Sequence, residues 1–93
     1  MIRYVVILKD GDEYKVAGGR LKAERGHTVR FYNFADAPAT VSFDTVKPIA
    51  DFTLETEGGK KDWPGIESGY YPYTVMVGKQ EATASKPIVI VYP

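Results

Sequence analysis

The sequence contains no cysteine and a single histidine, His27. Without cysteine the chain cannot form disulfide bonds, iron–sulfur clusters, thiolate zinc sites or a cysteine nucleophile. With one histidine it cannot build a metal site from several of its own imidazoles. No motif of another active site stands in the sequence, so we expect a protein that is not an enzyme and that carries no cofactor.

The chain also lacks an excess of either charge and a long apolar run. Twelve Lys and Arg residues balance twelve Asp and Glu residues, which gives a formal net charge of zero. Nucleic-acid binders typically carry a basic excess, so no nucleic-acid partner is expected. No apolar run reaches the ~20 residues that span a bilayer, and the start does not resemble a signal peptide. The compartment stays open, because a cysteine-free chain suits both the cytosol and an exported domain.

What the sequence does contain is strand composition. Its 93 residues predict one domain over 1–93, and Gly and Pro divide it into short segments rich in Val, Ile, Thr, Tyr and Phe. No segment shows helical spacing of apolar residues. Seven or eight short strands predict an all-β fold, either a β-sandwich or a small Greek-key barrel, and the fold that we expect is a Greek-key β-sandwich. The predicted strands are 2–9, 13–16, 20–24, 28–34, 39–43, 51–57, 70–77 and 88–92, and the segment 58–62 (GGKKD) is predicted to be a polar turn.

Alternation along 70–77 (YYPYTVMV) predicts which side chains face the core. Successive strand residues point to opposite faces, so Tyr71, Tyr73 and Val75 share one face, which we assign to the core. The opposite face then points to solvent or to a partner, and its residues are Tyr70, Pro72, Thr74 and Met76. Because proline cannot donate a ladder hydrogen bond, Pro72 predicts an edge strand or a bulge.

Two segments resemble the cupredoxins, the β-sandwich family of plastocyanin and azurin. The first is 25–33 (RGHTVRFYN) followed by 38–44 (PATVSFD), which is similar to the family's Gly-Asp-x-Val-x-Phe-x-Asn strand and its Pro-His-Asn-Val-x-Phe-Asp strand. The second is 69–75 (GYYPYTV), which resembles the strand that leads to the copper cysteine. The final 88–91 (IVIV) resembles the last family strand. The resemblance covers about half of the chain and implies a sandwich of cupredoxin type.

The same resemblance shows where the chain departs from the family. Ala39 stands at the first copper histidine, Val75 at the cysteine, and Gly78 near the second histidine. A blue-copper site needs two imidazoles and one thiolate. The resemblance therefore implies a cupredoxin-like domain that binds no copper in the family's manner, with Val75 and Tyr73 filling the former metal pocket.

The function that we expect is a non-catalytic, metal-free binding or assembly module that recognises a protein partner. The predicted contact is the outward face of 70–77, with Trp63 at its rim. A homodimer is an alternative, because the first and last strands could pair with another chain if they lie at sheet edges.

Two further hypotheses stay open at this point. The first is carbohydrate binding, in which Trp63, Tyr70 and Tyr32 stack on sugar rings, although the interpretation that we favour for Trp63 is that it caps one end of the core. The second is a weak metal site formed by His27 and the N-terminal amine, which supply only two ligands.

Overall fold

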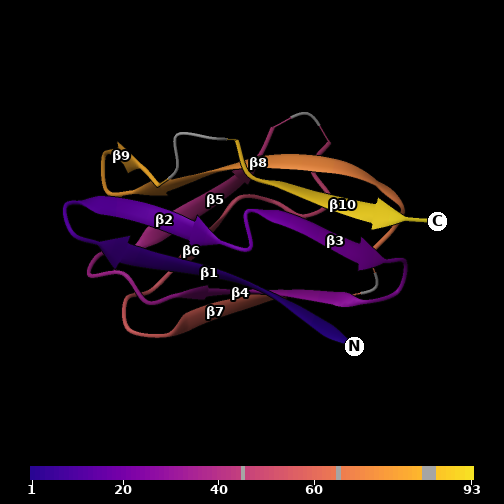
Figure 1. Cartoon of the computed structure of the whole chain (residues 1–93), viewed down its shortest axis with the longest axis horizontal. Helices are drawn as coiled ribbons and strands as arrows, with labels where there is room; N and C mark the ends of the chain where they lie inside the picture. The colour runs from indigo at the N-terminus through magenta and orange to yellow at the C-terminus, as the bar shows by residue number, and fades with distance from the viewer. Residues whose placement is uncertain (45, 65, 83–85) are drawn as a thin grey trace.

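In a computed structural model the chain forms two packed β-sheets, and the structure describes residues 1–44, 46–64, 66–82 and 86–93. No helix occurs among these residues, so no helix in the described ranges is long and apolar enough to cross a membrane. The strands (Figure 1) are β1 (Ile2–Asp10), β2 (Glu13–Ala17), β3 (Arg20–Glu24), β4 (Thr28–Asn33), β5 (Ala39–Phe43), β6 (Phe52–Leu54), β7 (Gly59–Trp63), β8 (Gly69–Val77), β9 (Gln80–Glu81) and β10 (Ile88–Tyr92).

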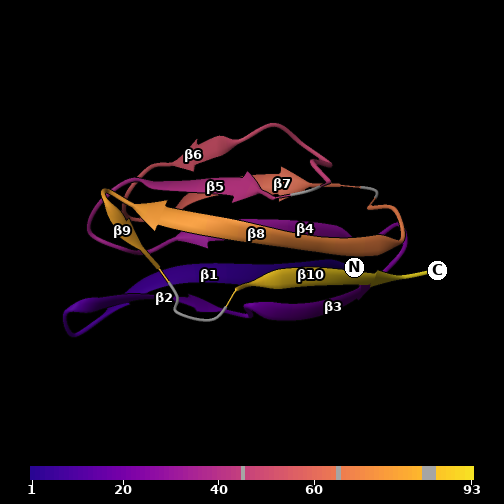
Figure 2. The same ribbon diagram turned by 90° about the horizontal axis from the view of Figure 1, so that it is seen from above.

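The two sheets are both mixed. One has the strand order β2-β1-β4-β7, and the other has the order β3-β10-β8-β5-β6, with β9 paired to β8. The neighbours β1 and β4 are parallel, as are β3 and β10, and the other pairs are antiparallel. Figure 2 shows the strands of both sheets running along the long axis of the molecule. Strands β1 and β10 lie inside their sheets, so the condition under which they could pair with another chain, a place at a sheet edge, is not met.

The core lies between the sheets and is centred on aromatic side chains. Phe31 of β4 contacts Tyr73 of β8 and Phe43 of β5 edge to face, with ring centroids 5.7 Å and 6.4 Å away. All three side chains are buried, and so is Val29, which lies two residues before Phe31 on the same face of β4. The alternation arises because every second side chain of a strand points to the same face. The all-β sandwich of cupredoxin type is therefore confirmed, while the Greek-key connection stays a prediction.

The strand count of seven or eight was too low, since the described residues form ten strands. One reason is β7, which occupies most of the segment predicted to be a turn. This strand pairs only with β4, and an edge strand tolerates exposed charges such as Lys60 and Lys61. The first residue of β7 is Gly59. A side chain does not fit at this position, because its Cβ would lie only 2.4 Å from the backbone oxygen of Glu55. This glycine was interpreted in the sequence as part of a turn, but the structure requires it because the backbone of Glu55 passes so close.

Pro72 does not mark an edge strand, because β8 lies between β10 and β5. The β5 ladder ends at the pair of Phe43 with Tyr73, and Pro72 is the next residue of β8. Its carbonyl still accepts a hydrogen bond from the backbone N–H of Asp44, at 3.0 Å. Pro72 lacks a backbone N–H, but it lies just beyond the last residue pair of the β5–β8 ladder, where no ladder hydrogen bond is needed. A central strand can therefore contain this proline.

Tyr73 carries the only buried side-chain oxygen or nitrogen, within the described ranges, that has no hydrogen-bond partner. Burial also raises the pKa of its hydroxyl above the usual tyrosine range. An unpaired buried hydroxyl is destabilising, so Tyr73→Phe is expected to leave the free energy of unfolding unchanged or to raise it by about 1–2 kcal/mol. Urea denaturation of the two proteins measures this difference.

The matched control is Tyr71→Phe. The Tyr71 hydroxyl donates to the backbone oxygens of Glu67 and Ser68, at 3.1 Å and 3.3 Å. Removing it is expected to lower the free energy of unfolding by about 1 kcal/mol. If Tyr73→Phe destabilised the protein as much as Tyr71→Phe, the Tyr73 hydroxyl would have a partner after all.

Candidate functional site

The positions that align with copper ligands lie at the end of the sandwich where β5 begins and β8 ends. Ala39 pairs with Val77, and Val41 pairs with Val75. All four side chains are buried. Gly78 follows directly, with a positive φ of 61°. This end of the molecule therefore presents aliphatic carbon where a copper site would need nitrogen and sulfur.

Tyr73 does not fill this position, contrary to the prediction. It pairs with Phe43, at the opposite end of β5 from Ala39, and packs in the middle of the core. Val75 does lie near the position and is buried, as predicted. The small, fully buried Ala39 is flanked within its sheet by Val77 and Leu54.

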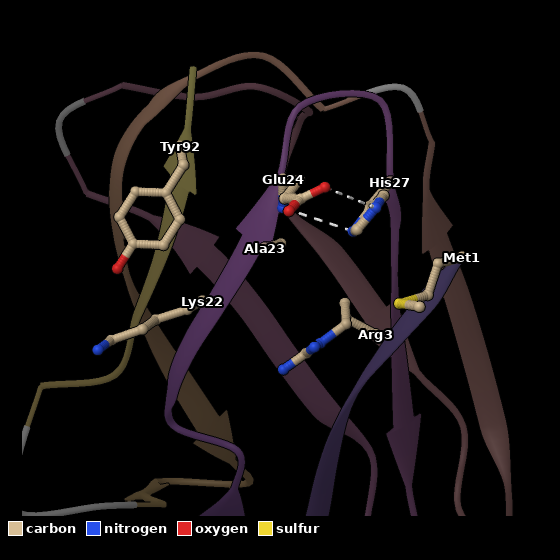
Figure 3. A pocket seen from close by; sticks show the side chains of 7 residues that line it. All are labelled: Met1, Arg3, Lys22, Ala23, Glu24, His27 and Tyr92. Carbon is tan, nitrogen blue, oxygen red and sulfur yellow. Dashed lines mark hydrogen bonds and ion pairs between the residues drawn. The ribbon is translucent and has the colours of Figure 1, made fainter.

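His27 lies at the other end of the sandwich, in the connection between β3 and β4. Figure 3 shows its ring beside Glu24, at the rim of a pocket of about 390 Å³ that also contains Arg3, Lys22 and Tyr92. Its Nδ1 accepts a hydrogen bond from the Glu24 backbone N–H at 3.4 Å, and its Nε2 lies 3.7 Å from the Glu24 carboxylate. Both ring nitrogens are therefore engaged within the turn.

No group of three or more His, Asp or Glu side chains in the described part of the chain is placed to hold a metal ion. His27 has the carboxylate of Glu24 beside it, 3.7 Å from its Nε2. His27 also lies at the opposite end of the sandwich from Ala39, the residue that aligns with the first copper histidine. The chain thus has no residue set that fits the copper of the proteins it resembles.

The predicted contact face of β8 is found on the outer side of its sheet. Tyr70 is 69% exposed, whereas Pro72, Thr74 and Met76 are half-buried. Thr74 is also engaged with its neighbours, since it donates a hydrogen bond to Asp44 at 3.2 Å and accepts one from Lys86. Tyr70 is therefore the most accessible aromatic group of this face.

The structure adds residues of β10 that the sequence alone did not assign to this face. Ile88 pairs with Pro72, and Ile90 pairs with Tyr70, so their side chains share the outer side of the sheet. The next outward residue of β10 is Tyr92, which is exposed. We call this surface the β8–β10 face, and its residues are Tyr70, Pro72, Thr74, Met76, Ile88, Ile90 and Tyr92.

Trp63 is not at the rim of this face, and that prediction is wrong. It lies at the end of β7 in the other sheet, and only 4% of its surface is exposed. Its ring packs edge to face on Tyr71, at 5.0 Å, and on Phe43, at 5.3 Å. It also lines a pocket of about 430 Å³, but with so little exposed surface it cannot offer a ring face to a sugar. The carbohydrate hypothesis thereby loses the residue on which it depended most.

Comparison with known proteins gives a likeness of fold only. No family model and no curated protein matches the chain. Among solved structures, it is similar to a purple cupredoxin from Nitrosopumilus maritimus, with 18% identity and a TM-score of 0.67 over 96% of this chain and 98% of that one. The P94A mutant of amicyanin has 20% identity and a TM-score of 0.64, over 96% and 82% of the two chains. A copper-containing nitrite reductase from Thermus scotoductus has 18% identity and a TM-score of 0.64, over 98% of this chain and 23% of that one.

These likenesses and the two-sheet architecture show that the chain has the cupredoxin fold. It carries that fold without the residues that hold copper, because a blue-copper site needs two imidazoles and one thiolate and the sequence has one histidine and no cysteine.

Proposed function

We propose that this chain is a non-catalytic domain of cupredoxin fold that works without copper and binds a protein partner. The observation that carries the proposal is the β8–β10 face. Its most exposed residues are Tyr70 and Tyr92, at 69% and 46%, whereas Ile90, which pairs with Tyr70, is only 7% exposed and adds little surface of its own. Tyrosines that stand out of a rigid sheet lose little side-chain entropy on binding, which makes them frequent anchors of protein interfaces.

The polar part of this face supports the same function. Lys86 and Asp44 form an ion pair at 2.8 Å beside Thr74, at the margin of the apolar residues. An apolar centre with a polar margin is the usual arrangement of a protein interface. The ion pair is partly exposed, so its role would be to orient a partner and to exclude poorly matched ones.

A paired substitution tests the proposal. We expect Tyr70→Ser/Met76→Ser to abolish capture of a partner from lysate of the source cells, while the free energy of unfolding changes by no more than about 1 kcal/mol, as for other surface changes. A captured protein would then be purified and titrated against both forms by calorimetry. Its affinity for the variant should fall by at least about tenfold, or ~1.4 kcal/mol.

The control is Tyr4→Ser/Phe34→Ser, which removes two exposed rings from the outer face of the other sheet. It should bind the partner as the unchanged protein does. Equal binding by the Tyr70 variant would remove the β8–β10 face from the proposal, and unfolding of that variant would show that its residues belong to the core.

A further inference from the structure

Strand β3 forms one edge of its sheet. Among the described residues its ladder is with β10 alone, so one side of its backbone faces away from the sheet. The oxygen of Gly19, just before β3, accepts a hydrogen bond from the Ile88 N–H at 2.7 Å. In a parallel ladder with this register, every second residue of β3 directs both of its backbone groups to β10, and these residues are Leu21 and Ala23.

The other residues of β3 direct their backbone groups to the open side, and they are Arg20, Lys22 and Glu24. The groups of Glu24 are already engaged by His27. Its Nδ1 accepts from the Glu24 N–H at 3.4 Å, and its own N–H donates to the Glu24 oxygen at 3.1 Å. Arg20 and Lys22 therefore each present one N–H and one C=O with which an added strand can pair.

The pocket of about 390 Å³ at this end of the sandwich lies along the open side of β3. Its lining includes the consecutive residues Lys22, Ala23 and Glu24, which point to alternate faces of the sheet, so the hollow lies over the edge of the strand. Figure 3 shows β3 passing between Lys22 and Tyr92 on one side and Arg3 on the other. An added strand would thus lie next to β3 with side chains of the protein on both flanks.

The open edge carries an excess of positive charge. Its side-chain cations lie on β3, directly after it or in the pocket lining, and they are Arg3, Arg20, Lys22 and Arg25. None of them forms an ion pair with a residue in the described ranges. Glu24 is the single carboxylate of the same set. An occupant of negative charge is therefore favoured, whereas a second copy of this chain would bring the same positive excess.

We propose that an extended acidic segment of a partner protein adds to this edge as a further strand of the sheet. Its backbone pairs with Arg20 and Lys22. Successive residues of a strand point to opposite faces, so two adjacent acidic residues meet Lys22 on the outer face and Arg3 on the inner side. The site is separate from the β8–β10 face, because an added strand pairs with the edge of the sheet and not with its outer side.

Binding of a defined peptide tests this proposal. The probe is the capped peptide Ser-Val-Thr-Glu-Glu-Val-Thr-Ser, called the acidic peptide, and its titration is followed by the amide chemical shifts of the protein. We expect a dissociation constant of roughly 0.1–1 mM at low salt. Two control peptides should bind at least about tenfold more weakly. One has both glutamates replaced by lysine, and the other keeps both glutamates but is methylated on their backbone nitrogens, so that it loses the donors needed for strand pairing.

Charge reversal in the protein supplies the matched variants. Arg3→Glu/Lys22→Glu should bind the acidic peptide at least about tenfold more weakly and should gain affinity for the lysine peptide. Lys60→Glu/Lys61→Glu makes the same change in charge on β7, an edge strand of the other sheet, and should bind as the unchanged protein does. Tyr70→Ser/Met76→Ser should also bind the acidic peptide normally, so a failure of this proposal is distinguishable from a failure of the β8–β10 face.

Hydrogen exchange in the unchanged protein covers the case in which the charge-reversal variant does not fold. With the acidic peptide, the amides of Arg20 and Lys22 should gain protection, while those of Leu21 and Ala23, which face β10, should stay as they are.

Three results would overturn the proposal. They are no binding of the acidic peptide at about 1 mM, equal binding of the methylated peptide, and protection gained elsewhere but not at Arg20 and Lys22. Protection of these two amides that rises with protein concentration in the absence of peptide would also overturn it, because the occupant would then be a second copy of this chain.

Discussion

Replacing Trp63 with alanine is expected to lower the free energy of unfolding by about 3–5 kcal/mol. The indole is 96% buried, as its 4% exposure shows, and lies opposite Val29 in the β4–β7 ladder. Two rings pack edge to face against it, those of Phe43 and Tyr71. Alanine would leave a cavity among these rings, and β7 has only one neighbouring strand to hold it in place.

This result would separate a core role from a binding role for the single tryptophan. Denaturation by urea, followed by circular dichroism, gives the free energy for the variant and for the unchanged protein. Tyr70→Ala is the control, because it truncates an exposed ring and should change the value by less than about 0.5 kcal/mol. A loss below about 1 kcal/mol for Trp63→Ala would show that the indole does not support the core and would reopen its role in binding.

The ambiguity of Trp63 in the sequence has a physical origin. The residue follows three charged residues, Lys60 to Asp62, and that run resembles a solvated turn. In the structure the run forms an edge strand, whose outer residues face water while its last residue turns into the core. Whether such a strand forms depends on its pairing with β4, about thirty residues earlier, and no local pattern reports that pairing.

Other features were predictable because they depend on local chemistry. The alternation in 70–77 correctly gave the inward Tyr71, Tyr73 and Val75, because the period of two is fixed by strand geometry. The absence of the copper ligands followed from composition. In contrast, the pairing of Ile90 with Tyr70 depends on the register between β8 and β10, and that register follows from packing of the whole sandwich. The sequence therefore predicted the β8 residues of the β8–β10 face but not those of β10.

A second large effect is expected at Asn33, which is the only buried side chain of the described residues that is neither aliphatic nor aromatic. Its side-chain nitrogen donates to the backbone oxygens of Ala37, at 2.9 Å, and Leu54, at 3.2 Å. Its side-chain oxygen accepts from the backbone N–H of Ala35, at 2.9 Å. One side chain thus joins the end of β4 to the following loop and to β6, right where the copper-ligand positions lie.

Asn33→Leu keeps the volume of this side chain and removes all three hydrogen bonds. Two buried backbone groups and one partly buried group then lose this partner, and each unsatisfied buried group costs about 1–3 kcal/mol, so we expect the free energy of unfolding to fall by about 3–5 kcal/mol. Hydrogen exchange adds a local measurement, because the Ala35 amide should lose its protection before the amides of β8 do.

Thr40→Val serves as the control for Asn33→Leu. It removes an exposed hydroxyl that lies 3.1 Å from the hydroxyl of Thr53, between β5 and β6, and should change stability by less than about 0.5 kcal/mol. A similar small change for Asn33→Leu would mean that apolar contacts among Ala39, Val77 and Leu54 hold this end unaided. The expected large loss would instead show that a hydrogen-bonded asparagine keeps this end of the sandwich in shape in a chain that has no copper ligands to do so.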